Sequence, residues 1–120
     1  MTEFVSAVPI IPAREIAASS AWYRDRLGFE IFHTEQEYGI VGRGETRIHL
    51  WGPSGIAPEE SMTMLRVGVR CIDELYEHCG AEGIVHPNGT LGERPWGTRE
   101  FSVRDTDGNL VTFFEAASPA

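Results

Sequence analysis

Few residues of this sequence have the types and spacings that acid–base, nucleophilic or metal chemistry needs. The four histidines, His33, His49, His78 and His86, form none of the HxH, HxxxH or HExxH spacings of metal sites. No GxSxG nucleophile motif occurs. Cys79 follows His78 directly, but neighbours on a helix point about 100° apart. Local motifs therefore predict neither a metal centre nor a covalent nucleophile.

The cysteines do not predict a cross-link either. On a helix that rises about 1.5 Å per residue, Cys71 and Cys79 would lie about 12 Å apart, which is too far for a disulfide. The absence of a CxxC pair also argues against a zinc ribbon. We expect Cys79 to be a small core residue.

Composition and charge narrow the class of function. The chain has 120 residues, 42% of them hydrophobic and 23% charged, as in one ordinary globular domain. The chain contains ten basic residues, all arginine, and 18 acidic residues, which gives a net charge of −8. Such a chain repels phosphate backbones and attracts cations, so we expect no nucleic-acid partner. No apolar run is long enough for a membrane span and no secretory signal is visible, so we expect no membrane partner and a cytoplasmic location.

Hydrophobic periodicity and turn residues divide the chain into two similar halves. Pro9 cannot donate to a strand ladder, so it must lie at an edge or a crossing point. An Asp-Gly pair at 107–108 is typical of a hairpin turn. The expected strands are 5–11, 29–34, 38–42, 46–51, 62–70, 84–86, 99–104 and 110–115, the expected helices are 14–27 and 72–81, and the expected irregular segments are the linker 52–61, the loop 87–97 and a frayed tail, 116–120.

This order predicts an α+β fold in which a strand–helix–strand–strand–strand unit occurs twice. We expect one domain, 1–120, made of two βαβββ modules, about 1–58 and 59–120. One such module has too little core to be stable alone, so the modules should pair.

Several segments resemble the vicinal oxygen chelate superfamily of glyoxalases and dioxygenases, and within it the bleomycin-resistance family. Leu27-Gly28-Phe29 and Asp105-Thr106-Asp107-Gly108-Asn109 are similar to superfamily-wide signals. The run 92–101, with Pro95-Trp96-Gly97 at its centre, is more specific to the resistance proteins. The resemblance implies a homodimer whose first strand crosses to the partner, with ligand grooves at the subunit interface. It also implies sequestration of a glycopeptide antibiotic without chemical change.

Enzymes of this superfamily hold a divalent metal with His, Glu or Gln side chains from four strands. By strand alignment those positions are close to Ala7, His49, Met64 and Thr112, and only His49 is a good ligand. The sequence therefore predicts no catalytic residues, no metal site and no cofactor, with metal arriving only as part of a metal-loaded drug. A metal-dependent lyase, thiol transferase or dioxygenase is the alternative.

The resemblance also implies which residues contact the drug. Trp96 and Tyr38, from different subunits, are expected to stack on opposite sides of a flat ring. Arg66 departs from the aromatic residue of close relatives; it is expected to bond a sugar or carbamoyl group or to pair with Glu100. A different DNA-damaging natural product therefore stays open as the ligand. The other expected ligand-binding residues are His33, His49, Trp51, Gly68, Gly97, Glu35 and Glu60, the last two being carboxylates for a cationic tail.

Overall fold

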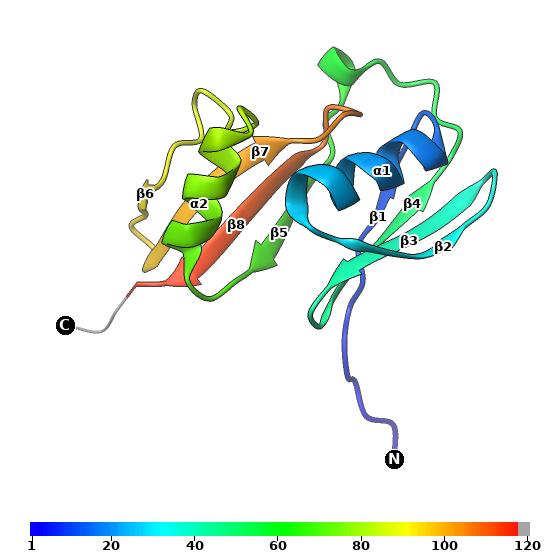
Figure 1. Cartoon of the computed structure of the whole chain (residues 1–120). Helices are drawn as coiled ribbons and strands as arrows, with labels where there is room; N and C mark the ends of the chain where they lie inside the picture. Colours follow the sequence, from blue (N-terminus) through cyan, green and yellow to red (C-terminus); the bar gives the residue numbers. More distant parts are fainter. Residues whose placement is uncertain (118–120) are drawn as a thin grey trace.

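Two similar modules lie side by side in the computed structural model, which describes residues 1–117 (Figure 1). Each packs one α-helix on a four-stranded sheet. The first module contains β1 (Ile10–Pro12), α1 (Ile16–Leu27), β2 (Glu30–Thr34), β3 (Tyr38–Arg43) and β4 (Thr46–Trp51). The 3-10 turn η1 (Pro58–Glu60) precedes the second, which contains β5 (Met64–Gly68), α2 (Ile72–Ala81), β6 (Gly92–Glu93), β7 (Thr98–Arg104) and β8 (Leu110–Ala116).

The two sheets have the same topology. Their strand orders are β1-β4-β3-β2 and β5-β8-β7-β6, and in each sheet the first strand runs parallel to the last while the other pairs are antiparallel. This confirms the predicted α+β class and the doubled βαβββ order. Within residues 1–117, neither helix has the length and apolar character needed to cross a bilayer.

The first strand is much shorter than the sequence predicts. Only Ile10–Pro12 pairs with β4, through the register Ile10↔His49. The preceding residues form an extended arm that leaves the body of the molecule (Figure 1), on which Phe4 and Val5 are 96% and 83% exposed. Apart from the Pro9 carbonyl, which accepts from the backbone N–H of His49 over 3.0 Å, the arm has no strand to pair with in the described chain. Apolar, β-prone residues cannot form a strand without such a neighbour.

Smaller corrections concern other element ends. The predicted strand 84–86 is a single bridge between Val85 and Val103, and the predicted loop 87–97 contains the short strand β6. Ala116 belongs to β8 rather than to a frayed tail, and residues 118–120 of that tail lie outside the described residues. The first helix begins two residues later than predicted, at Ile16.

The core lies between each helix and its sheet. One face of α1 is buried, with Tyr23 and Leu27 at 0% and 1% exposure. In the second module, Ile72 and Cys79 of α2 are fully buried. Desolvation raises the pKa of the Cys79 thiol to about 11, which keeps it a neutral core side chain, as predicted. Cys71 precedes α2 and is exposed, and both cysteines are free thiols in the described chain.

A buried polar cluster joins the two modules. The β7–β8 turn packs against α1, where the Tyr23 hydroxyl donates to Asp105 Oδ2 over 2.7 Å. Asp107 accepts from the backbone N–H of Arg14 over 2.8 Å and from the Ser19 hydroxyl. The predicted Asp-Gly turn is thus also the connection that sets one module against the other.

Candidate ligand-binding site

Each sheet has one face that no helix covers. Successive side chains of a strand alternate between faces; on β4, Ile48 and Leu50 face the core, so His49 and Trp51 face the other side. Trp51 is 60% exposed there. His49 and Trp51, both predicted to bind the ligand, therefore share the uncovered face. On β5, Leu65 is buried while its neighbour Arg66 is exposed, so the second sheet has the same arrangement.

On the first sheet, Tyr38 and His49 form a contact pair. The Tyr38 hydroxyl oxygen lies 2.6 Å from His49 Nδ1, and the two rings meet edge to face with centroids 5.4 Å apart. Register places Trp51 directly opposite Tyr38. The result is an aromatic surface built from β3 and β4.

The other predicted residues near this face lie at its rim. His33 follows a β-bulge in β2, and its Nε2 lies 3.2 Å from a carboxylate oxygen of Glu35. Both side chains are at least half exposed. Glu60 does not belong to this sheet, because it is an exposed residue of η1, which precedes the second module. A cation approaching the β2 edge would therefore meet the solvent-exposed carboxylate of Glu35, whose attraction is weak and sensitive to salt.

On the second sheet, Glu100 of β7 organises the open face. Its side chain is 4% exposed although it lies on that face, because Arg66, Trp96 and Thr98 surround its carboxylate. Arg66 donates to both carboxylate oxygens, at 3.1 and 2.6 Å, so the pairing weighed from sequence is the one present. Trp96 Nε1 donates over 2.9 Å, and the Thr98 hydroxyl donates as well.

These donors stabilise the charged form of Glu100. The Arg66 guanidinium has the largest effect, and with Thr98 and Trp96 it outweighs desolvation and lowers the pKa of Glu100 from 4.5 to about 2. The carboxylate is therefore ionised at neutral pH, and its charge is compensated by Arg66. A buried carboxylate that is paired with an arginine and also accepts its neighbours' hydrogen bonds holds those neighbours in fixed positions.

Trp96 combines exposure with a fixed orientation. It is 65% exposed between β6 and β7, yet its indole N–H is bonded to Glu100. Gly97, with φ +90°, has the left-handed backbone that this turn requires. An indole held by its edge, with its faces exposed, is suited to stacking on a flat ring.

Gly68 and Phe114 complete this face. A Cβ atom added at Gly68 would lie 3.2 Å from the Phe114 ring, so the ring fills the space that the glycine leaves. The same ring lies 4.6 Å beneath the Arg66 guanidinium carbon, a cation–π distance. Sequence reasoning missed Phe114 and Thr98. The period of two from Glu100 would have placed Thr98 on this face, whereas Phe114 depends on the β7–β8 pairing.

Within one chain, the open face that carries Tyr38 and the open face that carries Trp96 are not in contact. Tyr38 belongs to the first sheet and Trp96 to the loop before β7, and Figure 1 shows these elements on opposite sides of the molecule. Any ring stacked between Tyr38 and Trp96 must therefore contact two subunits.

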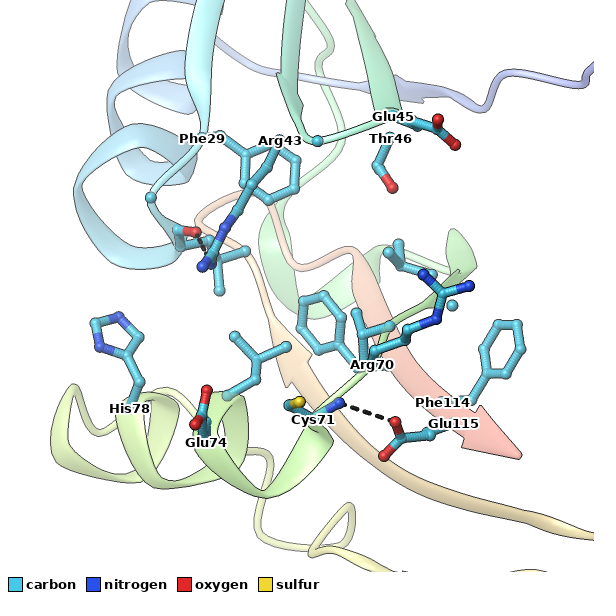
Figure 2. Close-up of a pocket in the computed structure, with 18 of the residues that line it drawn as sticks. Phe29, Arg43, Glu45, Thr46, Arg70, Cys71, Glu74, His78, Phe114 and Glu115 are labelled. Carbon is cyan, nitrogen blue, oxygen red and sulfur yellow. Dashed lines mark hydrogen bonds between the residues drawn. The ribbon is translucent and has the colours of Figure 1, made fainter. Parts of the chain in front are cut away.

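A cleft with a volume of about 1150 Å³ lies between the modules, and it shares Gly68 and Phe114 with the open face of the second sheet. Figure 2 shows Phe29, Arg43 and Thr46 of the first module facing Arg70 and Glu74 of the second across it. At its floor, the backbone N–H of Cys71 donates to a Glu115 carboxylate oxygen over 2.8 Å. Of the predicted ligand-binding residues, only Gly68 lines this cleft. Sequence reasoning missed the cleft because it depends on how the modules pack.

The structure also gives the cross-strand neighbours of the aligned metal-ligand positions. His49 lies opposite Ile10, and Thr112 lies opposite Arg66. Ala7 is on the exposed arm, and Met64 is 70% exposed at the start of β5. In residues 1–117, no three His, Cys, Asp or Glu side chains are grouped closely enough to bind a metal ion together.

Comparisons with known proteins identify the family. Residues 5–113 match the model of the Glyoxalase/Bleomycin resistance protein/Dioxygenase superfamily. A Bleomycin resistance protein of Geobacillus stearothermophilus is 35% identical over 127 residues, covering 92% of this chain and 96% of that protein. The Klebsiella pneumoniae Bleomycin resistance protein is 24% identical, covering 91% and 90%. The chain belongs to the glyoxalase/bleomycin resistance protein/dioxygenase superfamily.

Solved structures agree with this assignment. The bleomycin-binding protein of bleomycin-producing Streptomyces verticillus, solved with copper(II)-bleomycin, is 31% identical with a TM-score of 0.80, covering 99% of this chain and 100% of that one. The bleomycin resistance determinant encoded on the transposon Tn5 has a TM-score of 0.82 at 24% identity, covering 94% and 98%. At that identity, the second match shows the shared fold.

Proposed function

We propose that this protein binds a bleomycin-type glycopeptide antibiotic and confers resistance by sequestering it. The observation that carries the proposal is the exposed Trp96 indole, held by its N–H on the buried Glu100. A flat heteroaromatic ring gains about 1–3 kcal/mol from stacking on such a face, by analogy with stacked bases. The 31% identical relative solved with copper(II)-bleomycin supports this ligand class.

The binding unit proposed here is a homodimer with two grooves. Each chain supplies an aromatic sheet face with Tyr38 and a second face with Trp96, and these lie on different sheets. The N-terminal arm supports the dimer because its apolar side chains, Phe4, Val5 and Val8, are 96%, 83% and 43% exposed. Burial against a second copy would remove this apolar area from water. In this proposal the arms are exchanged between subunits.

The proposed activity is binding without chemical change. The buried thiol is neutral, and the one strongly perturbed carboxylate on the open face, Glu100, has its charge compensated and its oxygens occupied. Neither the neutral thiol of Cys79 nor the paired carboxylate of Glu100 is suited to act as a nucleophile or a general base near neutral pH. We propose that the protein has no cofactor of its own, that any metal enters as part of a metal-loaded drug, and that it acts in the cytoplasm.

Calorimetric titration with metal-free and Cu²⁺-loaded bleomycin at low salt tests the binding. We expect saturable binding with one drug per subunit and a dissociation constant below micromolar. The absence of saturable binding for both forms would refute the function. Elemental analysis of protein purified without chelators tests the enzyme alternative, since a stoichiometric bound metal would favour it.

The oligomeric state is a separate test. Light scattering of the intact chain should give twice the monomer mass of 13.3 kDa. Deletion of residues 2–8 should shift the mass toward the monomer and weaken drug binding together. A full chain that is monomeric at micromolar concentration and still binds the drug would refute the shared groove.

A further inference from the structure

Arg66 is the polar group of the second open face whose hydrogen-bonding capacity is least used. A guanidinium carries five N–H donors, and the pair with Glu100 uses two of them, one on each terminal nitrogen. In residues 1–117, the structure gives the other three no acceptor. The Arg66 side chain is 48% exposed, so these donors are accessible to a ligand.

The position of Arg66 is fixed from two sides. Glu100 holds the terminal nitrogens in a bidentate pair, and the Phe114 ring lies 4.6 Å beneath the guanidinium carbon. Because the side chain is held before any ligand arrives, a ligand that bonds to it loses less affinity to side-chain ordering.

The Glu100 carboxylate is much less accessible than Arg66. Its Oε2 accepts from Arg66, Trp96 and Thr98, its Oε1 accepts from Arg66, and the side chain is only 4% exposed, so a ligand donor has little access to it. The indole N–H of Trp96 is already used. The cluster therefore offers a ligand two features: the faces of the Trp96 ring and the remaining N–H donors of Arg66.

The charge of this cluster selects among acceptors. The Arg66 charge is compensated by the ionised Glu100, and the whole chain carries a net charge of −8, which repels anions. Because the charge of Arg66 is compensated and the chain repels anions, the remaining N–H donors of Arg66 favour an uncharged oxygen over a phosphate or a carboxylate.

Resting on the proposed function, we infer that Arg66 is a specificity-determining residue that donates hydrogen bonds to an uncharged oxygen of the drug's sugar portion while the flat ring stacks on Trp96. The acceptor is a carbamoyl or a sugar hydroxyl oxygen, which share this chemistry. Glu100 acts as a positioning residue, since it holds both Arg66 and Trp96.

The test compares three metal-free ligands: bleomycin, bleomycin without its carbamoyl group, and bleomycin without its sugars. Each is titrated into the wild-type chain, Arg66→Met and the control Arg99→Met. Arg99 is also paired bidentately with a carboxylate, that of Asp73, and it belongs to the same strand as Glu100 but outside the Glu100 cluster. Arg66→Met should weaken bleomycin binding about tenfold, the size of one charge-assisted hydrogen bond, and the control less than twofold.

The ligand series identifies the acceptor. If the carbamoyl oxygen accepts, Arg66→Met should have no effect on the carbamoyl-free drug; if a sugar hydroxyl accepts, its effect should vanish only for the sugar-free drug. An equal loss against all three ligands, or no loss against any, would overturn the inference. Failure of the wild-type chain to bind any of them would instead refute the proposed function.

Two further variants separate ligand contact from disruption of the cluster. The double variant Arg66→Met with Glu100→Gln leaves no uncompensated buried charge and keeps an amide oxygen for Trp96. Arg66→Lys keeps the charge without the planar fork. Both should retain native tryptophan fluorescence and still lose about tenfold on bleomycin. Recovery of wild-type affinity in the double variant would show that Arg66 contacts only Glu100, and would overturn the inference.

Discussion

The indole N–H of Trp96 donates a 2.9 Å hydrogen bond to the carboxylate of Glu100, four residues further along the chain. The bond connects the most exposed tryptophan of the protein to a carboxylate that is almost fully buried. Trp96 is thus a surface aromatic residue whose ring is held at its N–H edge, while the faces of the ring stay accessible. This relationship, together with the bidentate Arg66–Glu100 pair, fixes the side chains on the open face of the second sheet, where we propose that the planar part of the ligand binds.

Trp96→Ala should weaken bleomycin binding by about 1–3 kcal/mol, the range for one stacked ring. Trp96→Phe keeps a ring but loses the N–H bond to Glu100, so it should lose less than the alanine variant. Calorimetry measures both. Unchanged affinity of Trp96→Ala would remove Trp96 from the site.

The Arg66–Glu100 pair should make stability depend on pH in the acid range. The folded pKa of Glu100 is lowered from 4.5 to about 2, so its contribution is complete above the unfolded pKa and is lost as pH falls from about 4.5 through about 2. Because Arg66 is half exposed, we expect a loss of about 1–3 kcal/mol rather than the full value of the shift. Urea unfolding at pH 2–7 measures it.

Glu100→Gln should flatten this part of the pH profile. The control is Asp73→Asn, which removes the exposed partner of Arg99. Although Arg99 lowers the pKa of Asp73 as well, solvent screens that pair, so the control should change the profile little. An unaltered acid transition in Glu100→Gln would contradict the role of this carboxylate.

Tyr23→Phe should destabilise the fold by about 1–3 kcal/mol, because it removes the donor to the buried Asp105. Desolvation already raises the pKa of Asp105, and loss of the donor leaves that carboxylate less satisfied. Tyr76→Phe is the control, since the structure gives the Tyr76 hydroxyl no hydrogen bond in residues 1–117. Chemical denaturation compares the two, and equal effects would contradict the role of the inter-module cluster.

Gly108→Ala should be far more harmful than Gly44→Ala, although both glycines have left-handed backbones, with φ of +81° and +58°. A Cβ at Gly108 would lie 1.9 Å from the carbonyl oxygen of Pro58, while nothing lies within 4 Å at Gly44. We expect Gly44→Ala to cost about 1 kcal/mol and Gly108→Ala at least about 3 kcal/mol. Thermal and urea unfolding measure the difference, and similar costs would refute the close packing of Pro58 on the turn.

Much of the fold could be predicted because its signals are local. The hydrophobic period predicted the helix 72–81 with the bounds that α2 has, and the strand predicted at 46–51 is β4 with the same bounds. The Asp-Gly turn at 107–108 predicted the β7–β8 hairpin. Periodicities of this kind are set by backbone geometry, so no distant contact is needed to read them.

The sequence by itself determined the α+β class and the doubled module, because hydrophobic period and turn residues act over a few positions. The resemblance of segments such as 92–101 and 105–109 indicated the family. Only the tertiary structure decided that Glu100 is buried beneath Trp96, that Phe114 supports Arg66, and that Tyr23 joins the modules through Asp105. It also decided that residues 5–8 do not pair as a strand. Burial, ion pairing and strand pairing depend on contacts between segments that are distant in the sequence. Those contacts are determined by strand register and by the packing of the two modules.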